Sequence, residues 1–425
     1  MIADAGRIDQ RGRKANGGRL CALLLSATSM AWVGEAHALW DGQVEPFVAY
    51  SVTHDDNVFR ISGQSDPAIV LGAPSKGDTY NTTSAGLNFD LPVSRQRFTG
   101  GVSLAKNRYD QFSVLDFTER HARAIWLWQV GNALSGRLGT TSDRALASLA
   151  NVQSGVQSGT PNPLETRKTF LEATYRLGAR WRVKGEASQL EQSNEVPASQ
   201  VNDITNEGAG LTVSYVTPAD NQIGLSVQTQ KGDLPNPQLV NAVLVDNSYR
   251  QRRAGVTADW TITGRSHLRA SLGKVRRSFE QVPARDHEAG FYRAAYDWTP
   301  GGPFALSVTA QRDIAEPDEV NAGVNIGFVL VKGIALRPTY RATEKLDFSG
   351  SIETADWEYL GDAGVALGAV APRSDRVRST TLAMSYQPLR SVRLGLALRR
   401  ETRTSTAALG DYKVEVLSLS ARLAF

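Results

Sequence analysis

The residues of this chain that could do chemistry are mainly arginines. They recur at every second position within short segments in which polar and apolar residues alternate. Alternate side chains of a strand share one face, so this spacing places the arginines together on the polar side of a sheet. The guanidinium is a planar fork that pairs with carboxylate, sulfate or phosphate, and a confined set of such groups attracts polyanions. We expect an anion path to be lined by Arg123, Arg176, Arg253, Arg269, Arg293, Arg337, Arg393 and Arg399.

The same polar face also carries acids, which leaves a second interpretation open. By alternation these acids are Asp90, Glu172, Glu186, Asp259, Asp297, Asp347 and Glu353. They are fewer than the basic residues of that face, which also include Arg97, Arg137, Arg182, Lys184, Arg341 and Arg422. The excess predicts a cationic surface. Many of the arginines could instead pair with acids across neighbouring strands and only satisfy buried charge.

Motifs for catalysis or cofactor binding are poorly represented. Beyond the N-terminal segment the histidines are His54, His121, His267 and His287, and the sequence has no His-Glu-x-x-His, nucleophile elbow or phosphate loop. The single cysteine, Cys21, lies in the N-terminal segment, so neither a thiol nucleophile nor a cysteine-ligated metal is expected. We therefore predict no enzyme, no cofactor and no metal. A hydrolase built on a histidine and a serine or aspartate is the alternative.

The segments that position the arginines are separated by a regular succession of turns. Proline and glycine mark the short turns, where a strand ladder must end, and longer polar stretches alternate with them. The short turns are Pro92 to Gln96, Gly131 to Ala133, Gly178 to Arg180, Pro218 to Asn221, Gly264 to Ser266, Pro300 to Pro303, Ala342 to Lys345 and Pro388 to Ser391. With a first strand at Val44 to His54 and a last at Tyr412 to Phe425, this pattern predicts an all-β, antiparallel up-and-down barrel of about 18 strands. Sixteen strands are the alternative, because Asp313 to Phe328 reads either as a loop or as additional strand.

The final residues show the strand alternation most clearly. Leu417, Leu419, Leu423 and Phe425 form one apolar face with Ala421 between them, as in the closing strand of bacterial outer-membrane barrels, and Phe425 would be the assembly signal. On other strands the apolar face ends in aromatics beside the short turns, which fits an interfacial girdle. A soluble β-sandwich with an aromatic core is the alternative. Pro338 falls inside an expected strand, where it would require a bulge.

The N-terminal segment predicts the compartment. Residues Met1 to Arg19 are polar and basic, Leu20 to Val33 are apolar, and Ala36-His37-Ala38 is a cleavage site, so residues 1–38 are expected to be a removed signal peptide and 39–425 the barrel domain. The apolar run is shorter than the roughly 20 residues that a membrane helix needs. The negative mean hydropathy argues against helical spans elsewhere. We expect export to the outer membrane of a Gram-negative cell.

One motif resembles a known family. The segment Asp55-Asp56-Asn57-Val58-Phe59-Arg60, which follows the first expected strand, resembles the start of the EpsL-like outer-membrane barrels of exosortase-associated exopolysaccharide operons and of related barrel-porin families. The likeness extends through the strand and turn repeats to Phe425. In that segment Asp55, Asp56 and Asn57 could bind Ca²⁺, but an Asx-type turn that caps the strand is the preferred reading, with Phe59 under the loop.

The resemblance implies a role in polysaccharide export or assembly. We expect a passive conduit for an acidic extracellular polysaccharide, with the outer-membrane bilayer, the outer-membrane assembly machinery and a periplasmic export partner as its surroundings, and with no nucleic-acid partner. A general small-solute porin, a hydrolase that uses His121 or His267, and a plugged structural or adhesive barrel are the alternatives.

Overall fold

The computed structural model describes residues 43–149, 161–240, 242–315, 328–360 and 371–425. The strands are β1 (Val44–Asp55), β2 (Asp78–Val93), β3 (Gln96–Tyr109), β4 (Phe117–Val130), β5 (Leu134–Leu146), β6 (Pro163–Leu177), β7 (Trp181–Asn194), β8 (Ile204–Val216), β9 (Gln222–Asp233), β10 (Gln238–Val240), β11 (Val243–Val245), β12 (Tyr249–Thr263), β13 (Ser266–Phe279), β14 (His287–Gly301), β15 (Phe304–Ile314), β16 (Phe328–Thr343), β17 (Leu346–Leu360), β18 (Arg373–Leu389), β19 (Val392–Ser405) and β20 (Tyr412–Ala424). The helices are α1 (Pro67–Val70) and the 3-10 turns Ser113–Leu115, Pro197–Asn202 and Pro283–Arg285. Within the described ranges, no helix has the length and apolar character needed to cross a membrane.

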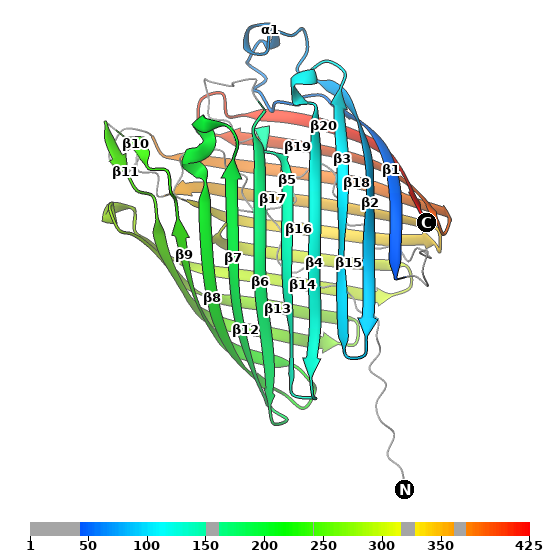
Figure 1. Ribbon diagram of the computed structural model, residues 1–425, viewed down its shortest axis with the longest axis vertical. Helices are drawn as coiled ribbons and strands as arrows, with labels where there is room; N and C mark the ends of the chain where they lie inside the picture. Colours follow the sequence, from blue (N-terminus) through cyan, green and yellow to red (C-terminus); the bar gives the residue numbers. More distant parts are fainter. Residues whose placement is uncertain (1–42, 150–160, 241, 316–327, 361–370) are drawn as a thin grey trace.

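Eighteen of these strands form one closed antiparallel sheet. Neighbours along the chain pair with each other, and β9 pairs with β12, with the small β10–β11 hairpin inserted between them in sequence. β1 pairs with both β2 and β20, so the sheet has no free edge. The predicted 18-stranded barrel is confirmed (Figure 1).

The two ends of the barrel differ in how its strands are joined. At one end, which we call the turn end, all eight predicted short turns join consecutive strands. At the other, the loop end, longer connections carry α1 and the β10–β11 hairpin (Figure 1). The stretch from Asp313 to Phe328, which could be a loop or additional strand from the sequence, has strand residues at both borders. β15 ends at Ile314 and β16 begins at Phe328. Residues 316–327 between them lie outside the described residues, as does the expected signal peptide, 1–38.

The barrel accommodates Pro338 inside β16 without the expected bulge. Pro338 lies opposite Leu306 of β15, while the ladder toward β17 is interrupted at Arg337 and Pro338 and then resumes in the same register. The interruption follows from the proline's missing N–H donor. Gly350 of β17 faces the ring, and a Cβ at that position would lie 3.3 Å from Pro338 Cγ. A larger residue there would crowd the proline.

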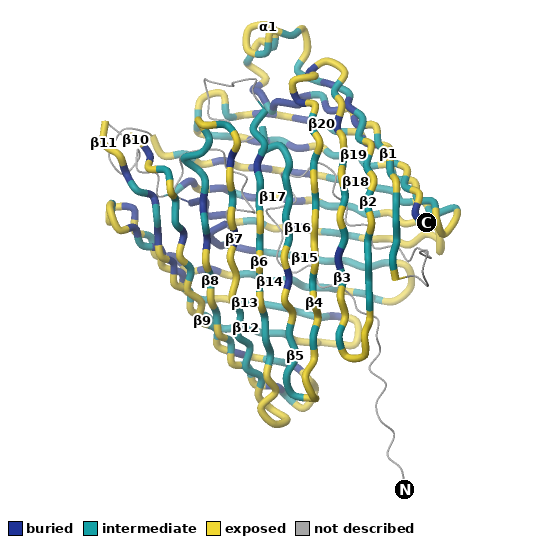
Figure 2. Tube along the Cα trace, in the orientation of Figure 1, coloured by how far each residue is buried: buried dark blue, intermediate teal, exposed yellow. Residues whose placement is uncertain are grey.

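Along the strands, exposed residues alternate with less exposed ones (Figure 2), and many of the exposed residues are apolar. In β20, Leu417, Leu419 and Leu423 are exposed, whereas Ser418 and Ala424, which alternate with them, are buried. The predicted faces of this strand are therefore confirmed. Most of the aromatics expected beside the short turns are also exposed, namely Trp126, Tyr175, Tyr215, Trp260, Trp298 and Tyr386, whereas Trp128 and Tyr296 are half-buried. Exposed apolar side chains around a closed barrel are typical of a wall that contacts lipid.

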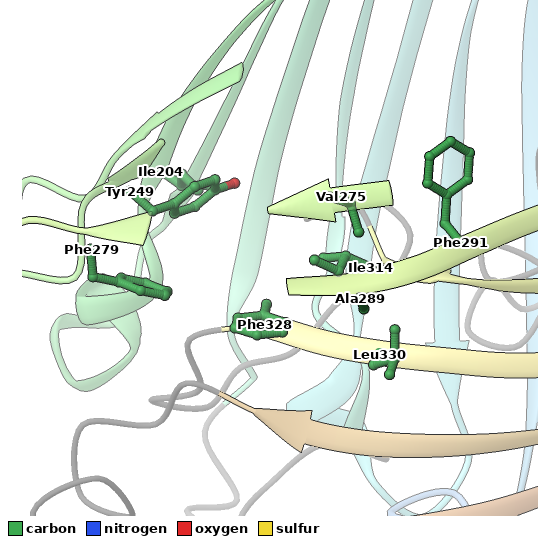
Figure 3. Close-up of a cluster of buried hydrophobic side chains, with 9 residues drawn as sticks. All are labelled: Ile204, Tyr249, Val275, Phe279, Ala289, Phe291, Ile314, Phe328 and Leu330. Atoms are coloured by element: carbon green, nitrogen blue, oxygen red, sulfur yellow. The ribbon is translucent and has the colours of Figure 1, made fainter. Parts of the chain in front are cut away.

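Near the loop end, the ends of β15 and β16 separate from β14 and lie over the inner face of the neighbouring strands. β14 pairs with β13 as far as His287, but with β15 only as far as Tyr292, which lies opposite Arg312. Beyond Arg312, β15 and β16 stay paired with each other and leave β14. Their outward-facing side chains then pack against the inner face of β12–β14. The cluster so formed contains Ile204, Tyr249, Val275, Phe279, Ala289, Phe291, Ile314, Phe328 and Leu330 (Figure 3).

The first residues of β16 are consequently covered on both faces. Phe328 and Leu330 pack toward β13 and β14, and Val329 and Val331 pack with Trp357 on the opposite side. All four of these β16 residues are buried. A strand covered on both faces needs a continuous apolar run, which this segment provides. The folded-in strand ends narrow the lumen at the loop end.

Candidate functional site: the charged inner wall

The charged side chains of the strands gather on the inner face of the barrel. Arg253 on β12 binds Asp313 on β15, with Nη1–Oδ2 and Nη2–Oδ1 distances of 2.8 and 2.7 Å. Two strands, β13 and β14, lie between them, so these side chains can meet only on the concave side of the closed sheet. Arg293 of β14 shares this face, since its Nε lies 2.7 Å from Asp313 Oδ2. Alternation extends the assignment along each strand.

Asp313 is the centre of a buried ion cluster at the overlap of the wall. Its side chain is only 2% exposed, and besides the two guanidiniums its Oδ1 accepts the Ile314 N–H at 2.9 Å. Arg253 also lies over the Phe291 ring, with its Cζ 4.7 Å from the centroid. A carboxylate buried without partners would cost several kcal/mol, so the two arginines are what makes this position tolerable. The cluster holds the bend of β15 against β12 and β14.

A second buried cluster lies on β17–β19. The side chains of Asp375 and Arg403 are 0% and 2% exposed and form an ion pair. The Tyr359 hydroxyl donates to Asp375 at 2.7 Å. Arg399 pairs with Glu401, which is likewise buried. These groups compensate one another's charge, and they make the loop end of this wall polar.

Most of the other arginines expected along the anion path are also paired. Arg269 lies 2.6 Å from Asp297, and Arg337 lies 2.6 Å from Glu353, in each case across neighbouring strands. Arg393 donates to the Gln387 side chain at 3.2 Å. Further ion pairs on the inner face are Arg97–Asp90, Arg137–Glu172, Lys184–Glu186, Arg341–Asp347 and Arg422–Glu45. Apart from Arg393, which contacts the uncharged amide of Gln387, these residues have the contacts with acids of the second interpretation.

Arg123 and Arg176 are different. Arg123 lies on the inner face of β4 between Gly101 and Thr141, and Arg176 lies opposite Arg182 near the turn end. Both are exposed, and neither forms an ion pair with any described residue. Their guanidiniums are available to a solute in the lumen.

Sequence reasoning missed the most buried acids of the inner wall. Asp313 and Asp375 border stretches that read as loops, and Glu401 was not assigned to a face. A signal for two of them exists in the strand pattern. Asp375 is two positions from Arg373, and Glu401 is two positions from Arg399, so each shares a face with a cation.

The histidines considered for a hydrolase are bound to carboxylates. His121 has its Nδ1 2.8 Å from Asp143 Oδ1 and its Nε2 3.3 Å from Glu119 Oε2. His267 Nε2 lies 2.7 Å from Asp259 Oδ1. Ser103 lies opposite His121 in the ladder, but both ring nitrogens of His121 are directed at acids. Among the described residues, neither histidine forms the nucleophile–base pair that covalent catalysis requires.

The segment that carries the family resemblance begins with a tight turn after β1. Asp55 Oδ1 accepts the Asn57 N–H at 2.9 Å, which is the expected Asx-type turn. Asp55 also accepts a hydrogen bond from Arg60 Nη1 at 2.8 Å. Burial alone would lower the pKa of Arg60, but the Asp55 carboxylate and weaker charges nearby outweigh it and raise that pKa above its ordinary value. The loop therefore holds Arg60 as a cation.

The same segment ties the first strand to the last. Asn57 is fully buried, and its Nδ2 donates to the carbonyl oxygens of Ile61 at 2.9 Å and of Lys413 at 3.0 Å. Asp56 Oδ1 accepts the Glu415 N–H at 2.8 Å. The oxygens that could bind Ca²⁺ are thus occupied by protein donors, and no group of three or more metal-ligating side chains occurs in the described part of the chain.

Two further residues of interest lie at opposite ends of the barrel. Phe59 is buried at the loop end, as expected, and meets Phe112 edge to face with the ring centroids 4.8 Å apart. Phe425, at the turn end, has an exposed side chain, and its N–H donates to the Pro46 carbonyl at 2.9 Å. The ring of Phe425 therefore adds little to the packing of the barrel.

Comparison with known proteins gives a likeness in shape. Neither a protein-family model nor a curated protein sequence matches the chain. Similar solved structures are Pseudomonas aeruginosa OpdK with vanillate (12% identity, covering 90% of this chain and 99% of that chain, TM-score 0.47), P. aeruginosa OccK2 (OpdF) in complex with glucuronate (12%, 90% and 98%, 0.48) and a BenF-like porin from Pseudomonas fluorescens Pf-5 (11%, 90% and 98%, 0.46). Likeness of this degree assigns neither a family nor a solute to this chain, which is defined by its own geometry: a closed 18-stranded β-barrel with an apolar exterior and a charged inner wall.

Proposed function

We propose that this protein is a passive aqueous channel of the outer membrane and that its solute is an acidic saccharide. The observation that carries the proposal is the closed 18-stranded wall, with exposed apolar side chains outside and charged side chains within. Barrels of roughly 16 to 18 strands are wide enough to leave an aqueous path. Such a path supplies no energy, so net export would be driven by synthesis or by a periplasmic partner.

An anionic solute is favoured by Arg123 and Arg176. Paired arginines attract a passing anion weakly because neighbouring acids neutralise them. An exposed guanidinium in a confined lumen keeps its field, and several weak contacts let a solute bind and leave, as conduction requires. These two arginines are therefore the best candidates for solute contacts, ahead of the ion-paired ones.

The polymeric form of the solute rests on the resemblance of Asp55 to Arg60 to the EpsL-like barrels. If the solute is a polymer, the channel passes an acidic extracellular polysaccharide. The outer-membrane assembly machinery would recognise the exposed Phe425. A small-solute porin is the second candidate, and the overlapping strand ends that narrow the loop end favour it.

Single-channel conductance of the refolded protein tests the acidic solute. We expect polygalacturonate to block the wild-type channel transiently and the block to weaken when Arg123 and Arg176 are both changed to Gln. Each open charge contributes about 1 kcal/mol in water-like surroundings, or about five-fold in residence time per arginine. Arg341→Gln is the matched control, because the Arg341 guanidinium already faces Asp347 at 3.4 Å.

The outcomes separate the candidates. Block by glucuronate but not by polygalacturonate would favour the small-solute porin, and an absence of conductance would favour a plugged structural barrel. Block that is equally strong in the Arg123 and Arg176 double variant would contradict the role of these arginines. In cells, normal secretion of polymer after deletion of the gene would count against polysaccharide export.

A further inference from the structure

The outward face of the barrel differs between its two ends. At the turn end the outward positions carry aromatic and apolar side chains such as Trp260 and Trp298. Toward the loop end the same face becomes charged, with acids such as Glu288 and Asp356 beside the cations. On β13, for example, the exposed Leu272 is followed at the next two outward positions by Lys274 and Arg276. On β13 the apolar band therefore gives way to cations on the loop side.

Several of these cations lie directly opposite one another in the ladder. The cross-strand pairs are Arg120 with Arg144, Arg252 with Arg276, and Arg312 with Lys332. Like charges at opposed positions repel, since their Cβ atoms are only about 4.5–5.5 Å apart. An anion beside the paired cations would relieve this repulsion, and in the first pair Arg144 already has one, since it lies 2.6 Å from Glu195.

The pair Arg252 and Arg276 is the clearest case. Both side chains are exposed, and within the described residues neither has an ion-pair partner. The acid opposite Arg276 in the ladder is Glu288, and its carboxylate lies 3.3 Å from Lys274 Nζ.

The flanking cations complete a basic patch. Arg250 lies 3.8 Å from Glu280, and Lys231, which is opposite Arg250, lies 2.7 Å from Asp233. Glu207 is the remaining acid opposite Lys231. The patch thus spans β9, β12 and β13, and its two unengaged guanidiniums, Arg252 and Arg276, lie opposite each other within it.

We propose that Arg252 and Arg276, with Arg250 and Lys274 beside them, bind the phosphate groups of an anionic lipid in the leaflet on the loop side of the barrel. The proposal rests on the membrane location inferred above. A phosphate between two guanidiniums accepts hydrogen bonds from both and turns their repulsion into a bridge. A lipid fits better than a soluble anion because exposed apolar side chains follow the cations on the outward face, Ala254 after Arg252 on β12 and Leu272 after Lys274 on β13, and would contact its acyl chains.

The lipid site can be tested by comparing the unfolding temperatures of the wild type and a double variant in two kinds of lipid. In phosphatidylcholine nanodiscs, the double variant Arg252→Gln and Arg276→Gln should unfold at the same temperature as the wild type or higher, because a repulsion is removed. In nanodiscs that also contain diphosphoryl lipid A, the wild type should gain stability and the variant should not, so the order reverses. Native mass spectrometry should show weaker retention of diphosphoryl lipid A by the variant, on the order of 30-fold for two surface cations.

Controls separate this site from charge in general and from the channel. Arg376→Gln removes another outward cation, but one that is paired with Asp356 at 2.6 Å, and it should leave lipid retention unchanged. Single-channel conductance should be the same in the double variant and the wild type, so loss of lipid binding would not be confused with loss of the channel.

Three results would overturn the lipid site. The first is an unchanged order of stability in the two nanodiscs, and the second is an equal effect of dephosphorylated lipid A. The third is full stabilisation by inorganic phosphate, which would identify a site for soluble anions. If the double variant does not insert, wild-type protein with phosphorylated and dephosphorylated lipid A still decides between these outcomes.

Discussion

Changing Asp313 to Ala should widen the loop end of the lumen and lower the stability of the barrel. The side chain of Asp313 is 2% exposed and receives guanidinium groups from Arg253 and Arg293. Removing one partner of a buried ion pair costs roughly 3–5 kcal/mol, because the remaining charges stay buried without compensation. The freed end of β15 would also lose its hold on β12 and β14. We expect a lower unfolding temperature and a larger single-channel conductance.

The matched control is Asp347→Ala. Asp347 pairs with Arg341 at 3.4 Å, and both side chains are more than half exposed. Exposed pairs contribute only about 0–1 kcal/mol, so this variant should keep the wild-type unfolding temperature and conductance. A wild-type conductance in Asp313→Ala would mean that the ion cluster does not hold the overlapping strands in place.

Changing Asn57 to Ala should destabilise the seam between β1 and β20. The Asn57 side chain is fully buried and bonds the Lys413 carbonyl and both backbone groups of Ile61 at 2.9–3.0 Å. Each buried backbone group left unpaired costs about 1–3 kcal/mol, so the loss of all three bonds amounts to roughly 3–9 kcal/mol. Urea unfolding, followed by the electrophoretic mobility of the folded barrel, should show a lower midpoint.

An exposed asparagine provides the comparison for Asn57. Asn132 lies in a short turn and accepts only a 3.3 Å hydrogen bond from Arg95. Asn132→Ala should leave the urea midpoint within experimental error. If both alanine variants unfold alike, the side chain of Asn57 does not stabilise the closed seam.

Alternation along single strands is enough to predict the barrel. The face of Leu419 or of Ser418 depends only on its own strand and on the side that meets lipid. Turn residues are equally local, since Pro388 to Ser391 breaks the ladder wherever the neighbouring strands lie. Strand number and both faces of β20 could therefore be predicted without knowledge of the pairing.

Contacts between distant strands could not be predicted in this way. Alternation places Arg253 on the inner face, but its partner Asp313 is three strands away and borders a stretch that reads as a loop. Ile314 alternates as an outward residue, and only the overlap of the wall buries it. The four consecutive apolar residues from Phe328 to Val331 were the available signal, because a strand exposed on either face would not need them.

The bonds between the first loop and the last strand also bear on the kinetics of folding. Thr53 and Ser418, which meet across the seam with their hydroxyl oxygens 2.8 Å apart, are separated by 365 residues. Bringing such ends together costs roughly 5 kcal/mol of chain entropy if the intervening chain is flexible, but much less once the strands between them have formed. Closure of the seam is therefore expected as the last step. The bonds of Asn57 to β20 form only at that step. We therefore expect them to lower the unfolding rate of the barrel and to leave its folding rate nearly unchanged.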